Sequence, residues 1–271
     1  MFFCELEKNK IKKIQKILNF GAKFFFVIFA ISFFWRPPLP NSKKILPEIS
    51  RDPVQKKTTR GKFIFEKSDE KFFVQPLFDY ELRGVVVSIP NMHSIFDPHN
   101  IGNEARQRDF CVIWGENTKN NLMKNFNFRS SNFSCHFSAK KNYWKKFRKN
   151  QLSNNHLIAA EKKILQKISA VEIGDQIFLR GVLAKYGDPH TGHVFRGSST
   201  TRDDTGDGAC ETIFVDEIKI LKKSAPLRSF FFGNSGRFFL IFLLAKIFFH
   251  FFFRAKKVEK KITSKFLLAQ K

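Results

Sequence analysis

The sequence predicts an α+β protein: a mainly antiparallel sheet or small barrel with one helix, flanked by two hydrophobic helices that enter a membrane. Three observations predict this fold class. Phenylalanine-rich apolar runs lie near both ends, β-branched segments lie between them, and basic residues are concentrated beyond the runs. The 271 residues are 43% apolar and 27% charged, with 36 Phe and a net charge of +24. This composition excludes collagen-like, coiled-coil and fully disordered chains.

Residues 1–19 form a basic N-terminus, and residues 20–35 form the first apolar run, interrupted only by Lys23. At 1.5 Å per residue, this run covers about 24 Å of the roughly 30 Å hydrocarbon layer. Trp35 suits the headgroup region, and Lys23 can extend its ammonium outward. We therefore expect an uncleaved signal anchor, with a cleaved signal peptide or a buried core helix as alternatives. The Arg36–Pro38 segment that follows offers no small-residue cleavage site.

The second apolar run, residues 230–253, follows a Gly233–Gly236 break and contains Lys246 and His250. Their i, i+4 spacing places both on one helix face. Such a stripe can face a partner helix or water. We expect this run to span the membrane, with a helix that lies in the membrane interface or packs on the domain as the alternative. Residues 254–271 are strongly basic. Because basic residues near membrane spans stay in the cytoplasm, both termini are expected there and the middle outside, at the inner membrane of a bacterial-type cell.

Between the runs, residues 36–60 hold five of the ten prolines and predict a semi-rigid tether. A folded domain is expected over residues 61–223. A helix is expected over 157–169, with an N-cap from Ser153–Asn155, and Gly181 is expected to let a strongly curved strand bend. Apolar alternation or β-branched runs predict strands at residues 62–66, 80–89, 110–115, 176–186 and 211–221.

The four cysteines divide by predicted compartment. Cys4 precedes the first span and would stay reduced or be lipidated. Cys111 and Cys135 flank an Asn-rich polar stretch that a cross-link would restrain, so a disulfide is predicted between them. Three buried thiols in a reducing compartment are the alternative. Cys210 is expected to be a small core residue rather than a nucleophile.

A polar loop is the first candidate site. It consists of Arg196, Arg202, Asp203, Asp204, Asp207 and Glu211. The spacing of its acids is not that of an EF-hand. We expect a loop held by Asp–Arg contacts and Asx-turn hydrogen bonds, with cation binding as the alternative.

Histidines form the second candidate site. His190 and His193 are close in sequence, and His99 lies in another Asp-Pro-His tripeptide. Three converging ligands would make a metal site, whereas Asp-Pro turns with surface histidines explain the pattern without a metal. His156 is expected to assist the helix start or to be buried beside it.

A basic and aromatic segment is the third candidate site. It consists of Lys140, Lys141, Tyr143, Trp144, Lys145, Lys146, Phe147, Arg148 and Lys149. Cations interleaved with rings suit an anionic lipid surface or single-stranded nucleic acid. A solvated linker or helix face is the plainer interpretation.

The sequence therefore predicts a membrane-anchored protein with a periplasmic binding or scaffold domain that is not an enzyme. The expected partners are the bilayer, anionic lipid headgroups or another envelope protein, and nucleic acid is not expected. No cofactor can be identified. The alternative is a metal-dependent hydrolase that uses the histidines and acids above, and a weaker one is a nucleic-acid-binding protein. The chain has no G-x-S-x-G, Walker, H-E-x-x-H or C-x-x-C motif.

Overall fold

The structure is a computed structural model that describes residues 2–35, 37–67, 69–90, 106–131, 134–201, 204 and 210–269. The chain divides into two compact units. Residues 1–36 and 226–271 make the helical unit, and residues 37–225 make the barrel domain.

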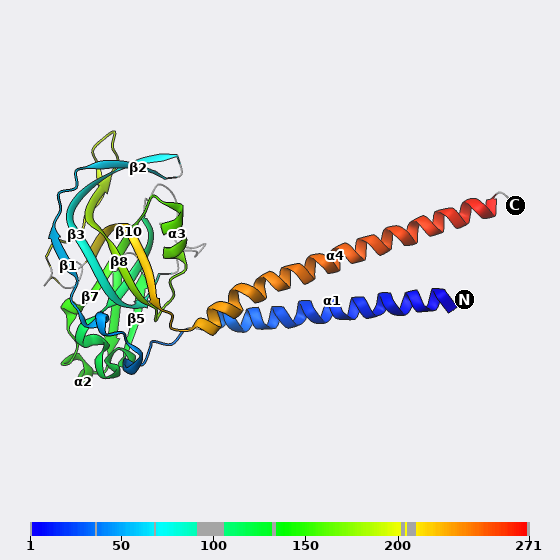
Figure 1. Cartoon of the computed structure of the whole chain (residues 1–271), viewed down its shortest axis with the longest axis horizontal. Coiled ribbons are helices and arrows are strands. Elements are labelled where there is room, and N and C mark those ends of the chain that lie inside the picture. Colours follow the sequence, from blue (N-terminus) through cyan, green and yellow to red (C-terminus); the bar gives the residue numbers. More distant parts are fainter. Residues whose placement is uncertain are drawn as a thin grey trace. The chain divides into compact units, whose positions relative to one another are not determined.

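The helical unit consists of α1 (Phe2–Phe34) and α4 (Pro226–Ala269). The barrel domain is built mainly from strands, with short helices between them (Figure 1). In chain order it contains η1 (Ser42–Lys44), η2 (Pro47–Ser50), β1 (Val54–Lys57), β2 (Phe63–Lys67), β3 (Glu70–Ser88), β4 (Arg106–Ile113), η4 (Gly115–Asn125), β5 (Phe126–Ser131), β6 (Ser134–Ala139), α2 (Lys141–Trp144), η5 (Lys149–Gln151), β7 (Leu152–Ile158), α3 (Lys162–Ser169), β8 (Gln176–Gly187), β9 (Val194–Arg196) and β10 (Cys210–Lys222).

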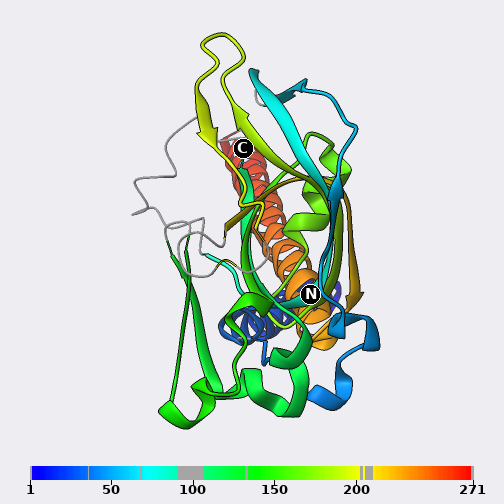
Figure 2. The same ribbon diagram turned by 90° about the vertical axis from the view of Figure 1, so that its left-hand side faces the viewer.

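Five strands close into a barrel (Figures 1 and 2). β3 pairs with β4, β4 with β7, β7 with β10 and β10 with β8, and β8 returns to β3. Among the described strands only the β7–β10 pair is parallel, so the predicted fold class is confirmed. The helix α3 connects the third barrel strand, β7, to the fourth, β8. This five-stranded Greek-key arrangement is the architecture of OB-folds.

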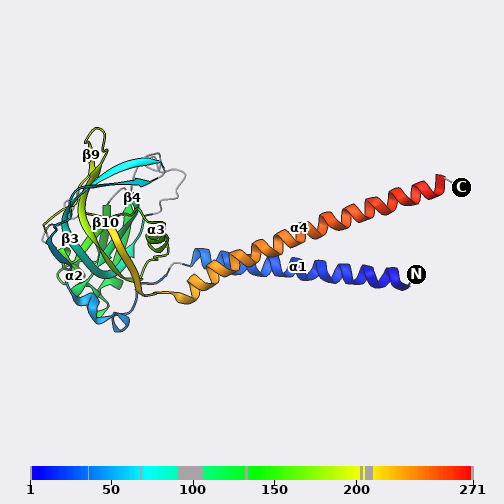
Figure 3. The same cartoon turned by 45° about the horizontal axis from the view of Figure 1, so that its top comes forward.

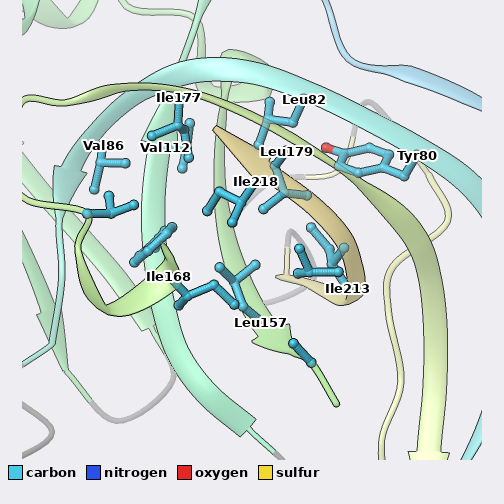
Figure 4. Packing of buried hydrophobic residues seen from close by; sticks show 14 of the residues in the cluster. Tyr80, Leu82, Val86, Val112, Leu157, Ile168, Ile177, Leu179, Ile213 and Ile218 are labelled. Atoms are coloured by element: carbon cyan, nitrogen blue, oxygen red, sulfur yellow. The ribbon is translucent and has the colours of Figure 1, made fainter. Parts of the chain in front are cut away.

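The barrel interior is filled by apolar side chains that alternate along the strands (Figure 4). β3 contributes Tyr80, Leu82 and Val86, whereas the intervening Val85 belongs to a second cluster on the outer face. From α3, Ile168 packs into the same core. Each side chain of this size that is fully buried contributes roughly 1.5–3 kcal/mol to folding.

The predicted strands correspond to β2, β3, β4, β8 and β10. Gly181 lies in β8 against β10, and a Cβ there would overlap the carbonyl oxygen of Phe214. Only glycine permits so close an approach of the two backbones. The predicted role of Gly181 in a tightly wound strand is therefore consistent with the barrel.

The helix predicted over residues 157–169 is shorter than expected. α3 begins at Lys162, and β7 occupies the first two predicted positions. The predicted cap residues Ser153–Asn155 lie inside β7, whose seven residues are all buried between β4 and β10. Polar residues are tolerated there because neighbouring strands satisfy them: the Asn155 amide donates to the carbonyl oxygen of Phe110 at 3.1 Å.

The segment predicted as a tether, residues 36–60, is largely part of the barrel domain. It carries η1, η2 and β1, and β1 pairs with β3. Ile49 is fully buried, and the Leu46 N–H donates to the Gln176 side-chain oxygen at 2.7 Å. The prolines break regular structure here, but apolar residues between them still pack onto the domain.

In the helical unit, α1 and α4 pack along one another in opposite directions. Phe29 lies 5.1 Å from Phe232 between ring centroids, and Phe25 lies 5.6 Å from Phe242. A Cβ at Gly21 would overlap the ring of Phe242. A small residue at this position therefore permits the close contact of the two helices.

The predicted break at Gly233–Gly236 does not interrupt α4. The Ser235 side chain is buried and its hydroxyl donates to the Phe231 carbonyl oxygen within the helix. Gly236 faces the ring of Phe29 in α1. These small residues allow helix packing instead of ending the helix, which is common between membrane helices.

Both helices are long and apolar enough to cross a membrane. The segments Asn9–Phe34 and Pro226–Phe253 have mean hydropathies of 2.0 and 1.8. Large apolar side chains point outward from them: Phe34 is 78% exposed and Phe248 is 72% exposed. The two helices thus fit a membrane-anchored protein.

Candidate functional site: a cationic lobe and a buried polar cluster

Two features occupy the outer face of β4 and β7. A lobe inserted between the two strands covers one end of the face, and a buried polar cluster lies toward the other. Because a fold alone does not define a function, each feature is considered by its own chemistry.

The cationic lobe comprises residues 115–151, with η4, β5, β6, α2 and η5. Its apolar side chains form a second core with residues such as Ile113 on the outer face of the barrel. Asn117 is fully buried and joins the two ends of the lobe. Its amide donates to the carbonyl oxygens of Arg148, at 2.7 Å, and Gln151, at 3.1 Å.

The charged side chains of the lobe are almost all basic. Its one acidic residue, Glu116, forms an ion pair with Lys119. Its nine basic side chains are all exposed: Lys119, Lys124, Arg129, Lys140, Lys141, Lys145, Lys146, Arg148 and Lys149. A surface of this kind attracts anionic groups with little competition from its own carboxylates.

The aromatic residues of the predicted basic and aromatic site point into the second core instead. Phe147 is 7% exposed, and its ring lies 4.3 Å from that of Phe126. Trp144 is half-buried and its indole N–H donates to the carbonyl oxygen of Ala139 at 3.0 Å. Tyr143 also packs against this core. The rings therefore position the lysines and are not a stacking platform for bases.

A disulfide between Cys111 and Cys135 joins β4 to β6, with Cα atoms 5.7 Å apart. The predicted pairing is confirmed. The bond fixes the β5–β6 hairpin of the lobe onto the outer face of the barrel, where Cys111 is fully buried. Disulfides persist in oxidising compartments, so this bond suggests that the barrel domain resides in one.

The buried polar cluster consists of Asp109 in β4, His156 in β7 and Arg196 in β9. Asp109 and His156 are direct partners across the β4–β7 pair, and each is 1% exposed. An Asp109 carboxylate oxygen lies 2.9 Å from His156 Nδ1, and Arg196 Nη1 lies 2.6 Å from His156 Nε2. A guanidinium can only donate, so Nε2 accepts and the ring proton is on Nδ1, beside the carboxylate.

This arrangement places the His156 imidazole between the Asp109 carboxylate and the Arg196 guanidinium. The Nε2 lone pair, which a general base would use, already accepts from Arg196. The nearest thiol along this face is that of Cys210, and burial raises its pKa, which disfavours the nucleophilic thiolate. In this conformation the cluster is suited to fixing β9 and the following chain onto the barrel, not to acid–base or nucleophilic catalysis.

The predicted metal ligands are not brought together among the described residues. His190 and His193 are exposed in the turn between β8 and β9. The Asp188 carboxylate accepts from the backbone N–H of His190 and the hydroxyl of Thr191, both at 2.8 Å, and these bonds lower its pKa. This is the turn chemistry that Asp-Pro predicts. His99 lies outside the described residues, and in the rest no three His, Cys, Asp or Glu side chains could hold a metal ion.

The predicted polar loop is described only in part. Arg202, Asp203 and Asp207 lie outside the described residues. Asp204 accepts a hydrogen bond from the Ser199 hydroxyl. Glu211 is buried in β10, and Arg196 belongs to the polar cluster.

Sequence reasoning missed Asp109 as a site residue and placed His156 beside a helix. The position of Asp109, directly before the apolar run that begins at Phe110, was the available signal. A carboxylate in a strand that is buried on both faces needs a partner. Its partner could not be found while the segment holding His156 was expected to be helical.

Comparison of the chain with protein-family models, curated proteins and solved structures gave no match.

Proposed function

We propose that this protein is a membrane-anchored module whose exoplasmic barrel domain binds anionic lipid headgroups through the cationic lobe, without catalysing a reaction. The observation that carries the proposal is the composition of the lobe surface: nine exposed basic side chains against one carboxylate, which is already paired. Each Lys or Arg near an anionic membrane contributes about 1 kcal/mol of attraction.

The place of the lobe in the barrel domain supports a lipid partner. The chain enters and leaves this domain at one point, where the Ser224 hydroxyl donates to the Pro38 carbonyl oxygen at 2.7 Å. Close to this point in sequence, the Ser42 N–H donates to the Asn121 side chain of the lobe at 2.9 Å. Figure 2 shows η1, η2 and the lobe at the same end of the barrel domain. The lobe therefore lies at the end of the barrel domain where the chain connects to the two apolar helices.

Charge supports the proposed topology, in which both termini are cytoplasmic and the barrel domain lies outside an inner membrane. Residues 8–16 contain five lysines, and residues 254–265 contain six basic residues. Such clusters beside apolar spans are retained on the cytoplasmic side. The disulfide of the barrel domain agrees with an oxidising exterior.

A direct test uses the full chain in nanodiscs of phosphatidylcholine and measures capture of fluorescent phosphatidylglycerol vesicles. Replacing Lys140, Lys141, Lys145 and Lys146 by Gln should weaken capture by at least about thirtyfold at low salt. The matched control replaces four exposed lysines outside the lobe by Gln: Lys162, Lys163, Lys167 and Lys185. The control should retain most of the capture, and capture by the natural chain should fall steeply between about 50 and 200 mM salt.

Equal capture by both variants would contradict the proposal, as would capture of phosphatidylcholine vesicles to the same extent. Binding of an acidic envelope protein without any binding of anionic vesicles would assign the lobe to a protein partner instead. Metal analysis of the purified full chain tests the hydrolase alternative. We expect less than one equivalent of zinc, calcium or manganese, and a stoichiometric metal would favour the hydrolase.

A further inference from the structure

A polar groove lies between the two helices of the helical unit. Near Gly21 the helices are in close contact, and beyond it they separate toward the chain termini (Figures 1 and 3). The space between them there has a volume of about 410 Å³. Gln15 and Asn19 line it from α1, and Lys246 and His250 line it from α4. The stripe that the i, i+4 spacing predicts in the second run therefore borders α1.

The apolar parts of the two helices that line this polar groove carry no carboxylate. Between residues 9 and 35 and between residues 226 and 253 the chain contains no Asp or Glu. An ammonium such as that of Lys246 is costly near hydrocarbon unless an anion accompanies it. The described side chains of the helical unit supply no such anion. The groove can therefore accept a charge-complementary ligand from outside the protein.

The depth of the groove identifies the zone of the membrane that it would face. Phe230 is near the start of α4, and Lys246 lies sixteen residues further on, about 24 Å along the helix. His250 lies about 30 Å from Phe230 by the same measure. The hydrocarbon layer is roughly 30 Å thick. With Phe230 at one boundary, His250 is therefore at the level of the opposite headgroups. Lys246 lies about 6 Å short of that level, a distance that its long side chain can span.

We propose that the polar groove binds one anionic phospholipid, with its phosphate at Lys246 and His250. Basic pockets between membrane helices on the cytoplasmic side bind anionic headgroups. The Gln15 and Asn19 amides supply neutral donors for further phosphate or ester oxygens. This site is separate from the cationic lobe, and under the proposed topology it faces the opposite leaflet.

The apolar part of the groove favours a lipid over a free phosphate ion. Leu18, Ile247 and Phe251 also line the space, beside the polar groups. An inorganic anion would leave these side chains without a partner, whereas a phospholipid can cover them with an acyl chain. The ligand class is therefore an anionic phospholipid held by both its phosphate and its chain.

The test measures binding of phosphatidylglycerol to the full chain in an uncharged detergent by native mass spectrometry. The natural chain should bind one phosphatidylglycerol in preference to phosphatidylcholine. Replacing Lys246→Gln together with His250→Gln should weaken this binding by about tenfold or more, and Lys246→Arg should retain it within about twofold. The matched control is Lys23→Gln, which removes a cation from α1 outside the groove and should change the affinity by less than about twofold.

Unchanged affinity in the double variant would overturn the inference, and so would an equal loss in Lys23→Gln. Equal binding of phosphatidylcholine would show an apolar groove only. Displacement of the lipid by inorganic phosphate at equal concentration would show a free-anion site. The variant that lacks four lobe lysines should bind phosphatidylglycerol in the groove like the natural chain, so failure of the lobe proposal and failure of this one are distinguishable.

Discussion

Phenylalanine occupies opposite positions in the two units of the molecule. In the barrel domain Phe110 is fully buried and Phe72 is 3% exposed, whereas in the helical unit Phe20 is 70% exposed and Phe248 is 72% exposed. Burial of apolar surface away from water explains the first pattern, and the second is stable only where the surroundings are themselves apolar. The barrel domain is therefore suited to water and the helical unit to apolar surroundings. The stability of each unit can be tested separately.

The largest expected effect comes from truncating a ring inside the barrel. Phe110→Ala should lower the free energy of unfolding of the barrel domain by about 3–5 kcal/mol, because it removes buried surface and leaves a cavity. Urea denaturation followed by tryptophan fluorescence measures the change. The matched variant Phe248→Ala should leave the unfolding of the barrel domain unaltered within about 0.5 kcal/mol. A similar loss in both variants would mean that the exposed ring also packs against protein.

A smaller effect is expected from enlarging a glycine in the helical unit. In Gly21→Leu the new side chain overlaps Phe242, so contact between the helices should weaken by about 1–3 kcal/mol. Cysteine cross-linking between α1 and α4 in membranes measures this contact. Gly233→Leu is the matched control, because a Cβ at Gly233 has no atom within 4 Å. Equal cross-linking in both variants would show that the packing around Gly21 does not hold the helices together.

The smallest expected effect is a change in the stability of the barrel domain with pH. Burial raises the pKa of the Cys210 thiol above its ordinary value of 9.0. The unfolded chain then loses this proton at lower pH than the folded chain. The contribution of Cys210 to stability is therefore complete below about pH 9 and declines as the pH rises toward the raised pKa.

This dependence is measured by comparing urea denaturation of the natural chain and of Cys210→Ala at several pH values between about 7 and 10. The natural chain should lose slightly more stability than the variant as the pH rises. Identical pH profiles would show that the thiol titrates alike in the folded and unfolded states.

The sequence predicts features of the fold that depend on local pattern. Apolar alternation identifies strands such as β2, and the two apolar runs identify the long helices α1 and α4, since each pattern reflects one kind of burial. The Cys111–Cys135 pairing follows from the polar stretch that separates these residues. The barrel closure, in contrast, depends on pairing between β3 and β8, which are distant in sequence, and no local pattern encodes it.

The candidate site was predictable only in part, for a similar reason. The basic character of residues 140–149 is visible in the sequence, but the direction of each ring is not, because it depends on the second core beneath the lobe. Ser153–His156 look like a polar helix start, yet neighbouring strands satisfy their side chains inside the barrel wall. The buried contact of His156 with Asp109 follows only from that tertiary pairing.

The central claim is that both apolar helices cross the membrane and hold the barrel domain outside. Labelling of single cysteines in intact cells with a membrane-impermeant maleimide tests it most directly, in a full chain that carries Cys4→Ser and Cys210→Ser. Lys146→Cys in the cationic lobe should be labelled in intact cells, and Lys265→Cys near the C-terminus only after the membrane is permeabilised. Protection of the cysteine at position 146, or labelling of the one at position 265 in intact cells, would contradict the account.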